Sequence, residues 1–267
     1  ARPKVPAVVL YHSDIVRQRV LGPLYQQLAP HLLKRPDAVV GATQAHLNSS
    51  QMDRFVPFDK RHVIPYGIDP RSLALTEAVQ RKAEVLRAQH GHKPLVFALG
   101  RHVYYKGFDV LIRAMAKVPA VLLLGGSGPM SAELRELASS TGAQVHFAGE
   151  IPEGDLPAYF HACNVYCLSS VATAEAFGIV QAEAMVCGKP VVNTWLHNGV
   201  NALAPEGLCA LTVQPGDVAA LSAALNQVLA DPALAQRLGD AGRVRILQSF
   251  SVDAMVKQTL ALYQSLT

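Results

Sequence analysis

The sequence is poor in cysteine, in charged residues and in long apolar runs, and each shortage excludes a class of protein. Its four cysteines, Cys163, Cys167, Cys187 and Cys209, lie in or beside apolar stretches and form no Cys-x2-Cys pair. We therefore expect buried, reduced thiols rather than a zinc site or a disulfide framework. Charged residues make up 16% of the chain and hydrophobic residues 50%, which excludes a disordered or fibrous protein.

Membrane-spanning and targeting segments are also missing from the pattern. The apolar stretches are about 5–8 residues long, well short of the roughly 20 residues that span a bilayer. Residues 1–20 contain no charged-then-apolar leader, so the sequence predicts a soluble, cytoplasmic protein. With 267 residues, the chain can form one large domain or two modest ones.

Charge is unevenly distributed along the chain. Residues 1–92 contain 13 Lys and Arg against 7 Asp and Glu, a net charge of +6, whereas residues 93–267 contain 11 against 13, a net charge of −2. A basic first third favours phosphate-bearing partners or peripheral contact with the inner face of a membrane. No Lys/Arg-rich run with interleaved aromatic residues is present, so we do not expect nucleic acid as a partner.

What the sequence does contain is an alternation of apolar strands and helices. Over residues 94–230 this alternation predicts a doubly wound α/β sheet whose parallel strands are buried on both faces. The first 70 residues supply two or three strands of a second such sheet. Residues 61–70 end in proline and glycine, which favours a linker between two domains.

Two carboxylates eight positions apart mark the most informative stretch. Glu175 lies in the loop after an apolar strand, and Glu183 lies in the following helix, which stops at Gly188-Lys189-Pro190. The expected helix start over residues 177–179 suits a phosphate, and Glu183 would then lie at the distance of a ribose. The alternative is a pair of solvated glutamates beside a buried helix.

Two further loops follow strands in the same half. Arg101 and Lys106 stand between a strand and a helix start, where two cations could hold a diphosphate or simply be surface charges. The Gly126-x-Gly128 loop, with Pro129 expected just inside the next helix and Glu150 about 20 residues on, imitates a dinucleotide-binding fingerprint and keeps a nicotinamide-dependent oxidoreductase open. Ser131, however, occupies the place of the third glycine.

At the other end of the chain, His12 follows the strand of residues 5–11. It could cap the next helix or pack in the core, or it could bind a sugar hydroxyl and assist proton movement.

Several of these stretches together resemble one family. Glu-Ala-Phe-Gly-Ile-Val…Glu-Ala-Met…Gly-Lys-Pro-Val-Val over residues 175–192 resembles the Glu-x7-Glu motif of the retaining GT-B glycosyltransferases of family 4. Gly-Arg-x4-Lys-Gly-Phe-Asp-x-Leu over residues 100–111 resembles that family's phosphate loop, and residues 63–69 resemble its interdomain junction. The segment that begins at His12 resembles the one found in bacterial mannosyl- and rhamnosyltransferases.

The resemblance implies a fold and its division. We expect a GT-B arrangement of two Rossmann-like domains: a partial acceptor-side domain over residues 1–70, a nucleotide-sugar domain over 71–249, and a final helix in 250–267 that crosses back to the first domain. Family members have a longer first domain, so the front of the fold and part of the acceptor site are expected to be missing.

The resemblance also implies roles and ligands. Catalytic roles fall on His12, Glu175, Arg101 and Lys106. The donor-binding set is Arg101, Lys106, Gly126, Ile151, Glu175, Phe177, Gly178, Ile179, Val180 and Glu183. The expected reaction transfers a hexose from a nucleotide-diphosphate sugar to a glycan or lipid-linked acceptor, with neither cofactor nor metal. The donor expected first is GDP-mannose, which would transfer mannose. The loop of residues 196–200 departs from the family pattern, and a catalytically silent nucleotide-sugar-binding fragment remains an alternative.

Overall fold

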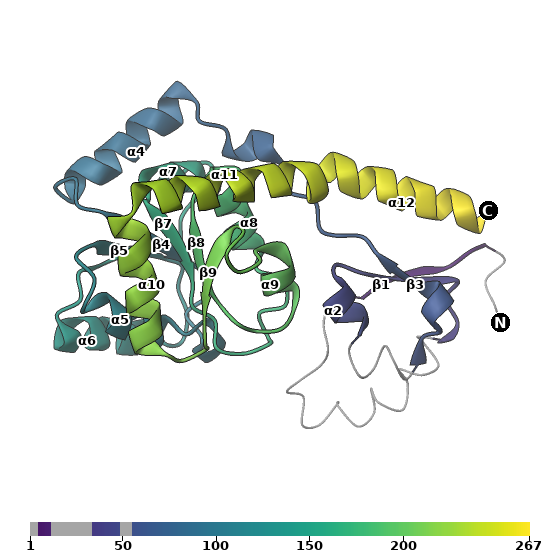
Figure 1. Ribbon diagram of the computed structural model, residues 1–267, viewed down its shortest axis with the longest axis horizontal. Helices are drawn as coiled ribbons and strands as arrows, with labels where there is room; N and C mark the ends of the chain where they lie inside the picture. The colour runs from purple at the N-terminus through teal and green to yellow at the C-terminus, as the bar shows by residue number, and fades with distance from the viewer. Residues whose placement is uncertain (1–4, 12–33, 49–54) are drawn as a thin grey trace.

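Two parallel β-sheets form the framework of the computed structural model, which describes residues 5–11, 34–48 and 55–267 (Figure 1). The small sheet has the order β1-β2-β3, and the large sheet has the order β6-β5-β4-β7-β8-β9. The small sheet contains β1 (Val8–Tyr11), β2 (Ala38–Gly41) and β3 (Arg61–Val63). The large sheet contains β4 (Leu95–Leu99), β5 (Val121–Gly125), β6 (Val145–Gly149), β7 (Val165–Leu168), β8 (Val191–Thr194) and β9 (Ala210–Val213).

Helices cover both faces of the large sheet. They are α4 (Glu77–Gln89), α5 (Phe108–Met115), α6 (Ser131–Thr141), α7 (Leu156–Ala162), α8 (Ile179–Val186), α9 (Gly199–Leu203), α10 (Val218–Ala230) and α11 (Pro232–Ser249). Successive side chains of β4 alternate between two cores: Leu95 and Phe97 pack in one, Val96 and Ala98 in the other. The predicted α/β fold with a sheet buried on both faces is therefore confirmed.

The order of the strands places a crevice in the middle of the large sheet. From β4 the chain builds outward through β5 to β6, then returns to β7 on the other side of β4 and continues to β9. In open parallel sheets, ligands bind outside the carboxyl ends of the strands where the winding direction changes. The loops after β4 and β7 therefore border the expected binding position.

A last helix, α12 (Val252–Leu266), joins the two parts of the molecule. Figure 1 shows it extending from the end of α11 across the small sheet. Its Leu262 is buried against Val40 of β2 and Ile64. The backbone of Ile68 bonds both to the Phe250 carbonyl and to the Val252 amide, at 2.8 and 3.2 Å, so the chain passes between the two sheets twice at one place.

The remaining described helices are short. They are α2 (Gln44–Leu47) and the 3-10 turns η1 (Phe58–Lys60), η2 (Pro70–Leu73) and η3 (Tyr104–Lys106).

The expected position of Pro129 just inside a helix is wrong. The helix after the glycine loop begins at Ser131, so Pro129 precedes it rather than lying inside it. The reason is that the Met130 amide donates to the His102 carbonyl in the loop after β4, while the Gly128 amide donates to the Ser131 hydroxyl.

No single described helix is long and apolar enough to cross a membrane. The pair α10 and α11 reaches the required length and composition together, but the two helices bend by 98° where they meet. Both contribute side chains to the core of the large domain, among them Leu225 and Leu238.

Candidate functional site at the carboxyl edge of the large sheet

Two residues predicted to act together form an ion pair at the centre of the crevice. Lys106 Nζ lies 2.5 Å from Glu175 Oε2, and the two side chains are only 14% and 12% exposed. Lys106 comes from the loop after β4 and Glu175 from the loop after β7, 69 positions later. The Ser170 hydroxyl donates a second hydrogen bond to the same Glu175 oxygen at 3.1 Å. A buried cation and a buried carboxylate therefore face the same small space.

A glycine allows these two loops to touch. Gly107 has a φ of +63°, and a Cβ at this position would lie 2.2 Å from the Ser169 carbonyl oxygen. In return, the Ser169 hydroxyl donates to the Lys106 carbonyl at 2.9 Å, and the Val171 amide donates to the Tyr105 carbonyl at 2.8 Å. A side chain at position 107 would separate the loops and hence Lys106 from Glu175.

Below the ion pair lies Tyr166 of β7, a residue that sequence reasoning treated only as part of a strand. Burial raises the pKa of its hydroxyl well above the usual range, and the carboxylates of Glu175 and Glu183 raise it further. Tyr166 lines a small cavity together with Lys106, Glu175 and Val180. The two predicted carboxylates thus lie near one buried hydroxyl.

The start of α8 adds the positive end of a helix to the same place. Gly178 is the N-cap, with a φ of +72° and no side-chain cap, so the first amides of α8 are not satisfied by a capping side chain. Ile179 is 41% exposed beside them, and Val180 is partly buried. The Phe177 side chain is buried, and its ring packs edge-on against Tyr66 at 5.0 Å, so it anchors the loop in the core.

Glu183 lies on the second turn of α8 and is half-buried. Burial, with a smaller contribution from Glu153, raises the pKa of its carboxyl to about 7. Within the described part of the chain its side chain has no hydrogen-bond partner. A carboxyl held in this way can accept hydrogen bonds from a ligand's hydroxyl groups.

Arg101 and Gly126 lie on neighbouring loops at this edge. The Arg101 side chain is exposed to solvent. Gly126 has a φ of +102°, and a Cβ there would come within 2.0 Å of the Gly100 carbonyl oxygen. The Gly126 amide also donates to the Gly149 carbonyl at 2.6 Å, so the loops after β4, β5 and β6 are in contact.

His102, which no sequence pattern singled out, holds two of these loops together. Its amide donates to the Ser127 carbonyl at 2.9 Å, and its carbonyl accepts from the Met130 amide at 3.1 Å. Its Nδ1 lies 2.9 Å from the Ser131 hydroxyl oxygen, which also accepts from the Gly128 amide. The ring is buried, and burial lowers its pKa, so His102 is a neutral structural group next to Arg101.

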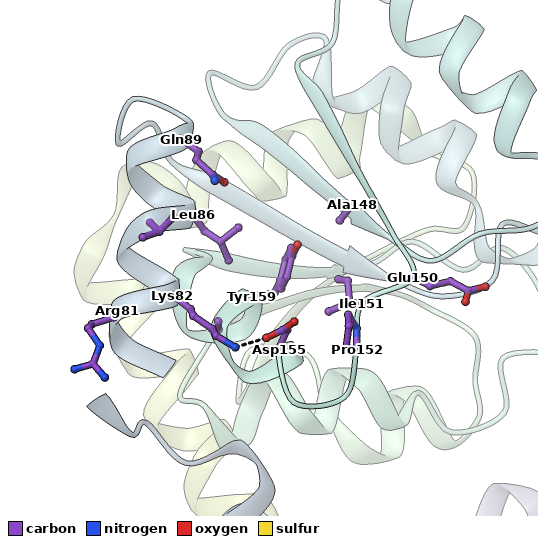
Figure 2. Close-up of a pocket in the computed structure, with 12 residues that line it drawn as sticks. Arg81, Lys82, Leu86, Gln89, Ala148, Glu150, Ile151, Pro152, Asp155 and Tyr159 are labelled. Carbon is purple, nitrogen blue, oxygen red and sulfur yellow. Dashed lines mark hydrogen bonds and ion pairs between the residues drawn. The ribbon is translucent and has the colours of Figure 1, made fainter. Parts of the chain in front are cut away.

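Ile151, predicted to contact a nucleobase, lines a larger cavity at the edge of the sheet. Figure 2 shows this cavity between α4 and the segment from the end of β6 to α7, with Tyr159 at its centre. Its volume is about 470 Å³, and its walls are mainly apolar. Lys82 of α4 and Asp155 form an ion pair across it. Ile151 lies in the loop after β6, and the loop after β5 separates it from the Lys106 loop after β4.

The role expected for His12 is not tested, and the expected burial of the cysteines is met at three of their four positions. His12 lies outside the described residues. All four cysteines are free, as expected, although Cys187 is half-buried whereas the other three are buried. Among the described residues, no group of three or more His, Cys, Asp or Glu side chains could hold a metal ion.

Known proteins resemble the chain over this same region. The family model described as Glycosyl transferases group 1 matches residues 82–245. The O-antigen chain mannosyltransferase C of Escherichia coli is 30% identical over 267 residues, covering all of this chain and 71% of that protein. The D-rhamnosyltransferase WbpZ of Pseudomonas aeruginosa is 31% identical over 247 residues, covering 92% of this chain and 64% of that protein.

A solved structure has the same fold. The crystal structure of Anabaena Alr3699/HepE in complex with UDP superposes with a TM-score of 0.85 at 25% identity, over 96% of this chain and 72% of that chain. The superposed part of this chain includes both of its sheets.

Proposed function

Because the chain belongs to the Glycosyl transferases group 1 family, we propose that its site binds a nucleotide-diphosphate sugar and transfers the sugar to an acceptor hydroxyl with retained anomeric configuration. The observation that carries this proposal is the buried pair of Lys106 and Glu175 beside the uncapped start of α8. It combines a cation, a carboxylate and a helix N-terminus at the position where parallel sheets bind ligands.

The diphosphate is assigned to Lys106, Arg101 and the first amides of α8. Negative charge builds on the diphosphate as the glycosidic bond breaks, so fixed positive groups that point there stabilise the transition state most. Lys106 is already desolvated, and this strengthens its interaction with an anion. These groups supply the charge stabilisation of a metal-independent route.

The carboxylates are assigned to the sugar rings on either side of the diphosphate. Glu175, released from Lys106 as the phosphate takes over that cation, accepts hydrogen bonds from hydroxyls of the transferred sugar. Glu183 accepts those of the ribose, one helical turn and a half further along α8. His12 is assigned to the transferred sugar by the resemblance of its segment. No separate nucleophilic carboxylate is assigned, so we favour attack on the same face from which the diphosphate departs.

The donor that we propose first is GDP-mannose, with the base beside the main chain of Ile151. Relatives named as a mannosyltransferase and a rhamnosyltransferase support a hexose or deoxyhexose donor, whereas the solved relative with UDP makes a uridine nucleotide the main competitor. The proposed acceptor is a glycan or a lipid-linked sugar, reached at the inner face of the cytoplasmic membrane.

The test is a product assay with the whole chain. Purified protein is incubated with GDP-mannose, UDP-glucose, ADP-glucose or dTDP-rhamnose, each with and without a methyl glycoside acceptor, and nucleotide diphosphate and glycoside products are measured. We expect release of nucleotide diphosphate with one donor class and a glycoside product with the anomeric configuration of that donor. Tight donor binding without either product would identify the catalytically silent alternative. Absence of binding to every donor would contradict the proposal.

A further inference from the structure

The only tryptophan of the sequence lies exposed beside the candidate site. Trp195 follows β8 directly, its amide donates to the Val213 carbonyl at 2.9 Å, and 36% of the residue is exposed. A tryptophan that is about one-third exposed forgoes part of the free energy that full burial would provide. The position of Trp195 at the carboxyl edge of the sheet therefore calls for an explanation other than core packing.

The loop that presents Trp195 is built to a fixed shape. His197 has a φ of +54°, a strained conformation for a residue other than glycine. The Asn201 side-chain oxygen accepts from the amides of Leu196 and His197, at 2.8 and 3.0 Å. Its nitrogen donates to the Thr194 carbonyl at 2.9 Å. One side chain thus bonds to the backbone on both sides of Trp195.

The same loop is fastened to the loop that carries Glu175. The Thr194 hydroxyl donates to the Ser170 carbonyl at 2.5 Å, and the Asn198 side chain donates to the Glu175 carbonyl at 2.6 Å. Trp195 lies between these two attachments in the sequence. The indole is therefore held in a fixed relation to the Glu175 loop.

Trp195 and His197 have complementary chemistry. The indole Nε1–H donates to His197 Nδ1 at 2.8 Å, and the two rings lie edge to face with centroids 5.2 Å apart. Since His197 Nδ1 is the acceptor, the proton of the neutral imidazole is on Nε2, where it is available to a ligand. With its own N–H already bonded, Trp195 offers an apolar ring face. An apolar face next to an N–H donor fits a pyranose, which has a C–H face and hydroxyl groups at its rim.

We propose that Trp195 and His197 form a pyranose-binding subsite: the indole packs on the C–H face of a sugar ring, and His197 Nε2–H donates to one of its hydroxyls. The inference rests on the proposed function, because it places the subsite beside the sugar held by Glu175. The ring is either the transferred hexose of the donor or the terminal sugar of the acceptor. The chemistry is the same for both, and the experiment separates them.

Fluorescence tests the subsite directly, because all tryptophan emission of this chain comes from Trp195. The whole chain is titrated with GDP, with GDP-mannose, and with methyl α-D-mannopyranoside in the presence of GDP; UDP and UDP-glucose form a second series. A donor subsite gives a saturable change with the nucleotide sugar that exceeds the change with the bare nucleotide. An acceptor subsite gives it only with the glycoside. No saturable sugar-dependent change in either series overturns the inference.

Calorimetry on variants provides the second readout. Trp195→Ala is expected to weaken binding of the sugar-bearing ligand about tenfold and to leave the Kd of the bare nucleotide unchanged. Trp195→Phe should retain most of the affinity, and His197→Ala should lose part of it. Tyr263→Ala, which truncates an exposed aromatic residue on α12, is the matched control and should behave as wild type. Equal losses with and without the sugar, or no loss at all, overturn the inference.

Failure of the proposed function gives a different result. In that case no nucleotide binds to the wild-type chain by calorimetry, and the methyl glycoside alone decides the subsite. A saturable change in Trp195 emission with the glycoside then supports a sugar site without a nucleotide, whereas no change overturns the inference as well.

Discussion

At the scale of single residues, the site is centred on the ion pair of Lys106 and Glu175, whose side chains are almost completely buried. The resemblance to the glycosyltransferase family selected Lys106, Glu175 and Glu183 in the sequence, but it did not indicate that Lys106 and Glu175 bond to each other. That pairing needs Gly107 to bring together two loops whose bonded residues are 69 positions apart. The buried Tyr166 beneath them was likewise hidden, because an apolar strand gives no signal that one of its residues underlies a site.

Removing the lysine should affect stability and binding in separable ways. Lys106→Met leaves Glu175 buried without its cation, so we expect a loss of about 3 kcal/mol in the free energy of unfolding. The same variant should bind the nucleotide diphosphate roughly 10- to 100-fold less tightly, because it lacks the cation that would contact the phosphate. The double variant Lys106→Met/Glu175→Gln should recover most of the stability but not the binding. Urea unfolding and calorimetry measure the two effects. Recovery of binding in the double variant would contradict the phosphate role.

Glu183 should make stability depend on pH. Its carboxyl pKa rises from 4.5 to about 7 in the folded protein, so the native state holds the proton more tightly than the unfolded state. The free energy of unfolding therefore falls as the pH rises from about 4.5 through about 7. Glu183→Gln cannot ionise and should be more stable than wild type at pH 8, by at most about 3 kcal/mol, with little difference near pH 4.5.

Urea unfolding at the two pH values checks this expectation, and Glu136→Gln, at an exposed position on α6, is the control. The ribose role adds a second expectation: Glu183→Gln should bind the nucleotide sugar less tightly although it folds more stably at pH 8. A pH dependence of stability identical to that of wild type would show that Glu183 is not the titrating group.

At the scale of elements, strands and helices followed from apolar periodicity, whereas the loops did not. The start of α8 after Gly178 and its end before Gly188 agree with the glycines of the sequence, since both adopt positive φ. Lys189 of the same motif donates to the His161 and Cys163 carbonyls at the end of α7, a structural role that no local pattern reveals. The joining of loops through His102 depends on contacts between β4 and β5 and was equally out of reach.

His102 should be needed for the shape of the phosphate loop. His102→Ala removes the bond to Ser131 and the ring contact with Phe108, so we expect a loss of about 2 kcal/mol in the free energy of unfolding and weaker nucleotide binding. The exposed His146→Ala is the control and should retain both properties. Chemical denaturation and calorimetry test this, and wild-type binding by His102→Ala would show that the loop holds its shape without the imidazole.

At the scale of the whole molecule, α12 connects the small sheet to the large domain. Its apolar positions predicted a helix, and the family resemblance suggested that it crosses between domains. The structure places Leu262 against the small sheet and leaves Leu260 exposed. The relation between the two sheets could not be derived from periodicity, because it depends on two backbone hydrogen bonds of Ile68, one to Phe250 and one to Val252 at the start of α12.

The two leucines provide a matched comparison. Leu262→Ala creates a cavity in the small core and should lower the free energy of unfolding by about 2–4 kcal/mol, whereas Leu260→Ala should change it by less than about 0.5 kcal/mol. Denaturation followed by tryptophan emission and by circular dichroism compares them. Equal effects of the two substitutions would show that α12 does not pack on the small sheet through Leu262.

The central claim is that a nucleotide diphosphate binds between Lys106 and the start of α8, and a crystal structure of the chain with GDP or UDP tests it most directly. We predict density for the diphosphate within hydrogen-bond distance of Lys106 Nζ and of the first amides of α8, with Glu183 on the ribose. Ordered nucleotide density away from the loops after β4 and β7, with the ion pair of Lys106 and Glu175 unchanged, would contradict the account.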